Sequence, residues 1–162
     1  MRRILMGALL CATLSLPAEA RNFAVPPKSP VVTVVVPDTW KVREIDFGYS
    51  AQSPDDEVVF YVEYASKKKL EAMLETNRAW MRENEIDDSV KPIEKEMDFN
   101  GTSGTVLRYD TKDANGKTIV DFVLLSGGEN QVIMLTLWGS AEERASHKAE
   151  ISAIMNSVRP IK

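Results

Sequence analysis

The sequence predicts an α+β domain built on a mainly antiparallel β-sheet with helices packed against it. Seven segments have the apolar pattern of β-strands, and two show the period of an amphipathic helix. Three tight-turn dipeptides separate or precede the later strands: Asn100-Gly101, Asn115-Gly116 and Gly127-Gly128. The expected order is β-β-β-α-β-β-β-β-α. Every strand link except the helical crossover is hairpin-like, which favours antiparallel pairing.

The first twenty residues have the organisation of a cleavable secretory signal peptide. Arg2 and Arg3 precede an apolar run over residues 4–16, and Ala18-Glu19-Ala20 offers small residues where a signal peptidase cuts. That run is shorter than the ~20 residues of a permanent membrane anchor. Lipidation at Cys11 is disfavoured because Leu10 precedes it. We therefore expect cleavage after Ala20 and, because the signal is of a bacterial type, a periplasmic location.

The mature chain, residues 21–162, is expected to have no transmembrane segment and no cysteine, so packing alone must hold it. Removing the leader takes away two arginines and one glutamate, which changes the formal charge from −4 to −5. This mild acidity argues against nucleic acid or bulk anionic lipid as the main partner.

The N-terminal half is predicted to hold a tether, three strands and a helix. Residues 21–30 contain three prolines and should be an extended tether outside the core. Residues 31–36 are β-branched and typical of a strand buried on both faces. Residues 42–49 and 58–64 are the next strands, and residues 67–85 form a helix with Ser66 as its N-cap.

The C-terminal half is predicted to hold four strands and a closing helix. The strands cover residues 93–99, 102–110, 118–125 and 132–138. Ser140 and Glu143 have the spacing of a capping box, which opens a helix that Pro160 stops. Residues 31–162 should therefore form a single domain.

This order of elements resembles the PsbP-like superfamily, and within it the bacterial periplasmic DcrB-type proteins. The resemblance rests on Val36-Pro37 followed by Trp40, two more strands, a helix, an antiparallel set, and a last helix that ends in Ser157-Val158. It implies an α/β/α sandwich and a binding or accessory protein without catalytic residues. Many DcrB-type proteins are lipoproteins, a feature that this sequence lacks.

No catalytic, metal or cofactor set emerges from the residues. The mature chain has one histidine, His147, expected at the edge of the apolar face of the last helix, and no nucleophile motif accompanies it. One histidine without cysteine also excludes the usual zinc sets. Residues 113–116 resemble half of a calcium loop but lack acids at its first and last positions, so they are interpreted as a hairpin turn.

Acidic turns and a lysine run remain as candidate sites. Residues 55–57 and 87–88 are consecutive acids, interpreted as solvated turns although a carboxylate pair can perform acid–base chemistry. Lys67, Lys68 and Lys69 form either a solvated face or a contact for phosphate or an acidic partner.

Tryptophans are the last candidates. Trp80 falls on the apolar stripe of the first helix and should pack in the core. Trp40 and Trp138 lie at strand ends, where tryptophan often anchors a partner.

The preferred hypothesis is a non-enzymatic periplasmic accessory protein that docks on an envelope protein complex. The alternative is a carrier of a small molecule or lipid, with a pocket between sheet and helix lined by Phe60, Tyr64 and Met73. A carboxylate-dependent hydrolase would require buried acids close to one another. The sequence leaves the partner and the oligomeric state open.

Overall fold

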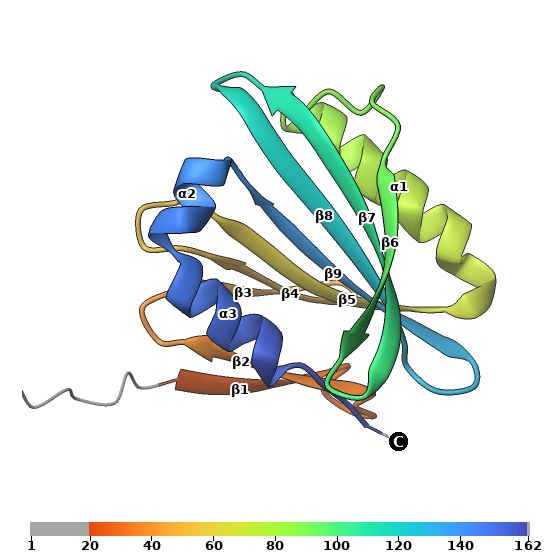
Figure 1. The fold of residues 1–162 in the computed structure, drawn as a ribbon. Helices are drawn as coiled ribbons and strands as arrows, with labels where there is room; N and C mark the ends of the chain where they lie inside the picture. The colour runs from red at the N-terminus through yellow and green to blue at the C-terminus, as the bar shows by residue number, and fades with distance from the viewer. Residues whose placement is uncertain (1–19, 162) are drawn as a thin grey trace, which may run out of the picture.

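A seven-stranded antiparallel sheet forms the centre of the protein, in a computed structural model that describes residues 20–161. The strand order is β3-β4-β5-β9-β8-β7-β6, and a second, three-stranded sheet has the order β1-β2-β10. Helix α1 covers one face of the large sheet, whereas α3 and the small sheet cover the other (Figure 1). The predicted α+β class with a mainly antiparallel sheet is confirmed. Residues 1–19 of the predicted signal peptide lie outside the described range.

The elements have the following bounds: β1 (Ala20–Val25), β2 (Val32–Pro37), β3 (Lys41–Ile45), β4 (Gly48–Gln52), β5 (Val59–Ser66), the 3-10 turn η1 (Lys67–Lys69), α1 (Leu70–Glu83), β6 (Ile93–Phe99), β7 (Thr102–Asp113), β8 (Gly116–Ser126), β9 (Gln131–Gly139), α2 (Ala141–Ser146), α3 (Lys148–Ser157) and β10 (Arg159–Pro160). No described helix has the length and apolar character needed to span a membrane.

The segment predicted as a tether belongs to the fold. Strand β1 pairs antiparallel with β2 from Ala20 opposite Pro37 to Val25 opposite Val32. Val25 is fully buried, and Phe23 packs against the same core. The prolines lie beyond the strand, in the connection to β2, so they do not prevent pairing.

Two strand predictions need correction. In β2 only alternate residues are buried, because one face meets the core and the other does not. The predicted strand 42–49 is a hairpin of β3 and β4, which turns just before Gly48. A Cβ at Gly48 would lie 1.9 Å from the carbonyl oxygen of Val62 on β5, so only glycine allows this approach.

The predicted closing helix is divided in two. Its capping box is confirmed: the Glu143 backbone N–H donates to Ser140 Oγ, and the Ser140 N–H donates to Glu143 Oε2. The break lies at His147, which ends α2 and begins α3. Ser66, by contrast, makes no side-chain cap, since η1 precedes α1 there.

Candidate functional site

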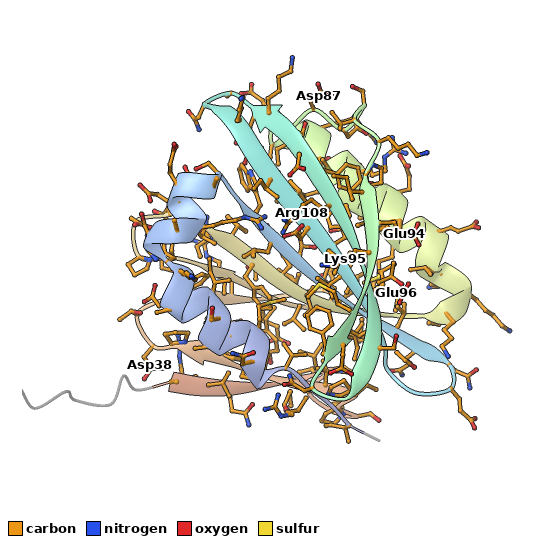
Figure 2. The ribbon with its side chains drawn as sticks, in the orientation of Figure 1. Asp38, Asp87, Glu94, Lys95, Glu96 and Arg108 are labelled. Atoms are coloured by element: carbon orange, nitrogen blue, oxygen red, sulfur yellow. The ribbon has the colours of Figure 1, made fainter. Side chains whose placement is uncertain are left out.

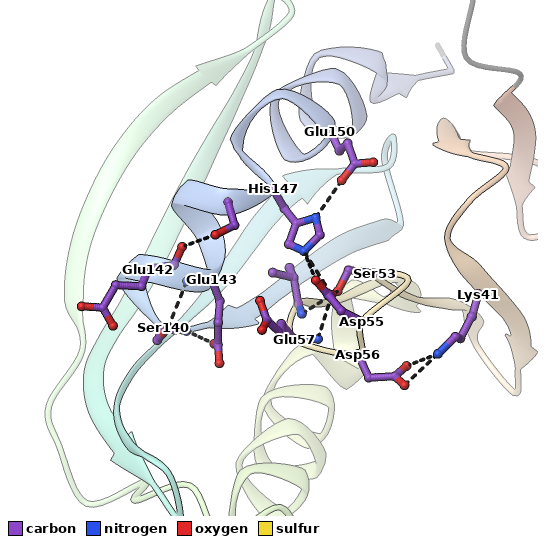
Figure 3. A network of polar contacts seen from close by, with 12 residues as sticks. Lys41, Ser53, Asp55, Asp56, Glu57, Ser140, Glu142, Glu143, His147 and Glu150 are labelled. Atoms are coloured by element: carbon purple, nitrogen blue, oxygen red, sulfur yellow. Dashed lines mark hydrogen bonds and ion pairs between the residues drawn. The ribbon is translucent and has the colours of Figure 1, made fainter.

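His147 joins the α2–α3 junction to the turn between β4 and β5. Its Nε2 lies 2.9 Å from Asp55 Oδ2 and 3.1 Å from Oδ1, while Nδ1 lies 2.7 Å from Glu150 Oε2 (Figure 3). Only 11% of the His147 side chain is exposed. We call His147, Asp55, Glu57 and Glu150 the His147 cluster.

The turn holds Asp55 in place through its own hydrogen bonds. Ser53 is fully buried, and its hydroxyl donates to Asp55 Oδ1 over 2.6 Å. The Val58 N–H donates to Ser53 Oγ and the Glu57 N–H to Asp55 Oδ1. The Asp55 carboxylate is therefore oriented before any ligand arrives.

These contacts set the charges of the cluster. The hydrogen bonds from Ser53 and His147 lower the pKa of Asp55 to about 2. The hydrogen bonds to Glu150 and Asp55 raise the pKa of His147 above its ordinary value. The geometry thus favours an ionised Asp55 against a protonated imidazole.

The cluster lacks the arrangement of a nucleophilic enzyme. The Ser53 hydroxyl donates to Asp55 rather than to the imidazole. Asp55 and Glu57 are exposed, so they are not the buried acid pair that a carboxylate-dependent hydrolase needs. One ligand atom each from Asp55, Glu57 and His147 lie within 4.8 Å of one another, which is close enough to converge on a cation.

An open groove of about 310 Å³ lies between β5 and α1, and we call it the β5–α1 groove. Its lining includes Phe47, Glu63, Tyr64, Lys69, Met73 and Asn77. Phe47 is 58% exposed, so much of its aromatic ring is left uncovered by residues 20–161, which the structure describes. Burial raises the pKa of Glu63, and a hydrogen bond with Asn77 opposes that rise.

A second groove of about 300 Å³ lies between β6 and α3, on the opposite face of the large sheet. Its lining includes Met97, Phe99, Val106, Arg108, Leu135 and Met155. Arg108 projects there from β7, between β6 and the helices α2 and α3 (Figure 2). It binds the buried carboxylate of Asp121 with two hydrogen bonds, of 2.8 and 2.9 Å.

A second arginine, Arg144 on α2, also binds Asp121. Arg144 Nη1 donates to Asp121 Oδ2 over 2.6 Å, and its other nitrogens donate to backbone carbonyls, among them that of Ile119. Burial alone would raise the pKa of Asp121, but the hydrogen bonds and charges of Arg108 and Arg144 hold it below its ordinary value.

The residues predicted as partner contacts lie in three different settings. Trp40 is 1% exposed in the core, so it offers no surface to a partner, contrary to our expectation. Trp138 is half-buried, its Nε1 donates to Thr118, and its ring packs edge-on to Trp80 at 5.6 Å. Lys67, Lys68 and Lys69 are exposed on η1, and Lys69 reaches the β5–α1 groove.

Sequence reasoning missed the His147 cluster. His147 was expected at the edge of the apolar face of one continuous last helix, whereas it lies at the break between α2 and α3. Asp55 is 92 residues away in the chain, and no local spacing signals that contact. The acidic turn was visible, but its orientation depends on the packing of α3 against the sheet.

The fold is similar to that of one solved PsbP protein and of a second solved structure. The solution structure of cyanobacterial PsbP (CyanoP) from Synechocystis sp. PCC 6803 matches with a TM-score of 0.61 and 10% identity, covering 96% of this chain and 99% of that one. A Bacteroides thetaiotaomicron crystal structure matches with a TM-score of 0.56 and 11% identity, covering 87% of this chain and 48% of that one. No protein-family model and no curated protein matches the chain. The chain thus has a PsbP-like fold, and at such low identity these likenesses extend to the fold alone.

Proposed function

We propose that this chain is a non-enzymatic accessory protein of the bacterial periplasm that docks on an envelope protein through the β5–α1 groove. The observation that carries the proposal is Phe47, whose ring is 58% exposed beside an open apolar groove. Exposed aromatic residues next to a concave apolar surface are typical of binding sites. The predicted signal peptide and the resemblance to DcrB-type proteins support the location.

Charge around the groove suggests the chemistry of the partner. Lys67, Lys68 and Lys69 form the 3-10 turn η1 ahead of α1, and no acidic residue lies in η1, although Glu71 lies in the first turn of α1. A partner segment with an apolar side chain for the groove and acidic residues beside it would meet both features. Such rim charges affect mainly the rate of association, so docking should weaken at high salt.

Site-specific photo-crosslinking in the native envelope tests this proposal. A photoreactive side chain at position 47 should yield a discrete protein adduct, and reversing the charge of Lys67, Lys68 and Lys69 together should lower its yield. Position 93 is the matched control, because Ile93 is 59% exposed on β6, at the far edge of the sheet. Equal adducts from positions 47 and 93, or an adduct yield unchanged by charge reversal, would contradict docking at this groove.

A carrier function is the second candidate, because the β5–α1 groove has the location predicted for a carrier. Tyr64 and Met73 line it as predicted, whereas Phe60 faces the other side of the sheet. Its volume of about 310 Å³ is at the lower end for ligand sites. Mass spectrometry of the purified protein separates the two functions: a stoichiometric lipid or metabolite, with no protein adduct at position 47, would support the carrier.

A further inference from the structure

The His147 cluster contains the elements of a metal site. We infer that Asp55, Glu57 and His147 bind a divalent first-row transition-metal ion, with Zn²⁺ as the representative. Each residue offers one ligand atom, and these atoms lie within 4.8 Å of one another. One imidazole nitrogen and two carboxylate oxygens are a ligand set that Zn²⁺ accepts, with water completing the coordination.

The spacing of the ligands suits a tetrahedral ion. Ligand atoms bound at about 2.0–2.1 Å are about 3.3 Å apart around a tetrahedral zinc. His147 Nε2 and Asp55 Oδ2 are 2.9 Å apart, so they need to separate only slightly. The Glu57 side chain is exposed and has room to close the remaining distance.

Independent support comes from the groups that contact the proposed ligands and hold them in place. A metal-binding histidine almost always contacts a carboxylate or carbonyl through its other ring nitrogen, and ligating carboxylates are themselves hydrogen-bonded. Here Glu150 Oε2 lies 2.7 Å from Nδ1, which directs Nε2 at the acids. Ser53 and the Glu57 N–H hold the Asp55 carboxylate. Both kinds of supporting contact are already formed.

Charge balance also favours a cation. Three carboxylates, those of Asp55, Glu57 and Glu150, surround one imidazole, so the cluster keeps negative charge even with that ring protonated. The neighbouring Lys41 pairs with Asp56 instead, at 2.7 Å. When the metal binds, it replaces the proton on Nε2, and that proton passes to solvent. The imidazole nitrogen favours Zn²⁺ and its neighbours over Mg²⁺ or Ca²⁺, which prefer oxygen ligands.

The experiment is a Zn²⁺ titration of the purified protein, followed by NMR and calorimetry. His147 is the one histidine of the sequence, so its imidazole gives a single set of signals. We expect one Zn²⁺ per chain, a shift of the His147 signals, release of a proton, and no change with Mg²⁺ or Ca²⁺. Unshifted His147 signals in excess Zn²⁺ would overturn the inference.

Two substitutions in the same turn distinguish a specific Zn²⁺ site from non-specific attraction of the cation to acidic residues. Glu57→Gln removes a direct ligand and should weaken Zn²⁺ binding by more than the roughly 10- to 100-fold that is typical of losing an outer-shell partner. Asp56→Asn is the matched control, since Asp56 is also exposed but pairs with Lys41, and this variant should bind Zn²⁺ as tightly as the wild type. Both variants keep the contacts of His147, so neither should unfold. Equal weakening in both variants would mean non-specific attraction and overturn the inference.

Discussion

Each face of the large sheet carries an acidic residue among apolar neighbours. The two residues differ in whether a counter-charge is present and in the direction of their pKa shift. On the α3 face, Asp121 is held by Arg108 and Arg144, and its pKa is lowered. On the α1 face, burial raises the pKa of Glu63, and among the described residues no cation forms an ion pair with it. The first carboxylate is neutralised inside the fold, whereas the second remains without a counter-charge in a groove.

The apolar cores on the two faces of the sheet also differ in composition and in what covers them. The core on the α3 face is rich in valine and is closed by a second sheet as well as by a helix. The core on the α1 face relies on the methionines Met73, Met81 and Met134, and on one helix. Valine has one preferred rotamer, whereas methionine adapts to irregular space. We conclude that side-chain packing is more tightly determined in the α3-face core than in the α1-face core.

Trp40→Ala should give the largest loss of stability, because it empties the centre of the α3-face core. Trp40 is 1% exposed, and truncating a buried tryptophan costs about 3–5 kcal/mol. Urea denaturation measures the free energy of unfolding. Trp138→Ala is the control and should cost less, because Trp138 is only half-buried; equal losses would break the contrast between the two faces.

Asp121→Asn should cost about 3 kcal/mol, because it leaves the charge of Arg144 inside without its partner. The folded pKa of Asp121 is lowered, so its contribution is complete above the ordinary Asp pKa of about 3.9 and is lost as the pH falls through the folded value. Unfolding curves of wild type and variant should therefore converge toward low pH. A constant difference at every pH would show that shape, not charge, matters at this position.

Met81→Leu should cost less than about 1.5 kcal/mol, although Met81 is fully buried under α1. The volume is nearly conserved, and the α1-face core is expected to repack. Thermal unfolding checks the prediction. The comparable change on the other face, Val34→Leu, adds volume to a closed core and should cost more; the reverse ranking would contradict the proposed difference in packing.

Glu63→Gln should have the smallest effect, a gain of roughly 0.5 kcal/mol at neutral pH. Burial raises the folded pKa of Glu63, so ionisation destabilises the fold as the pH rises through that value. The gain should vanish below the ordinary Glu pKa of about 4.3. Denaturation at two pH values measures this, and a loss at neutral pH would mean that the carboxylate has a partner.

Local patterns predicted the elements well, while contacts between distant segments escaped them. The capping box at Ser140 is a local feature, and β6 was placed at its observed bounds, residues 93–99, from period and turn signals. The hairpin of β3 and β4 was missed because Gly48 is not part of a recognisable turn dipeptide. A glycine is needed there because the backbone carbonyl of Val62 on the neighbouring strand comes close to Gly48, and this contact is not visible in the sequence. Residues 21–30 were predicted to be an extended tether because of their prolines. Phe23 and Val25 precede these prolines and belong to strand β1, which pairs with β2.

The same limit applies to the site. Asp55 was recognised as an acid in a turn and His147 as a residue at the edge of a helix's apolar face, but their contact requires the turn and the α2–α3 break to meet in space. Trp40 was judged from its place after a strand, and only the packed structure shows that its ring lies inside.

Strand β2 lies between β1 and β10, so the first and last described strands both pair with it. We expect this arrangement to determine from which side a protease opens the fold. A processive protease must pull a chain end free before it can thread the rest. From the C-terminal side it detaches β10, which contributes only two residue pairs. From the N-terminal side, with cleavage after Ala20, it must strip five pairs, from Arg21 opposite Val36 to Val25 opposite Val32, and extract the buried Val25. We therefore expect proteolytic turnover to begin at the C-terminus, and a stable tag there to prolong the lifetime of the protein more than one at the N-terminus.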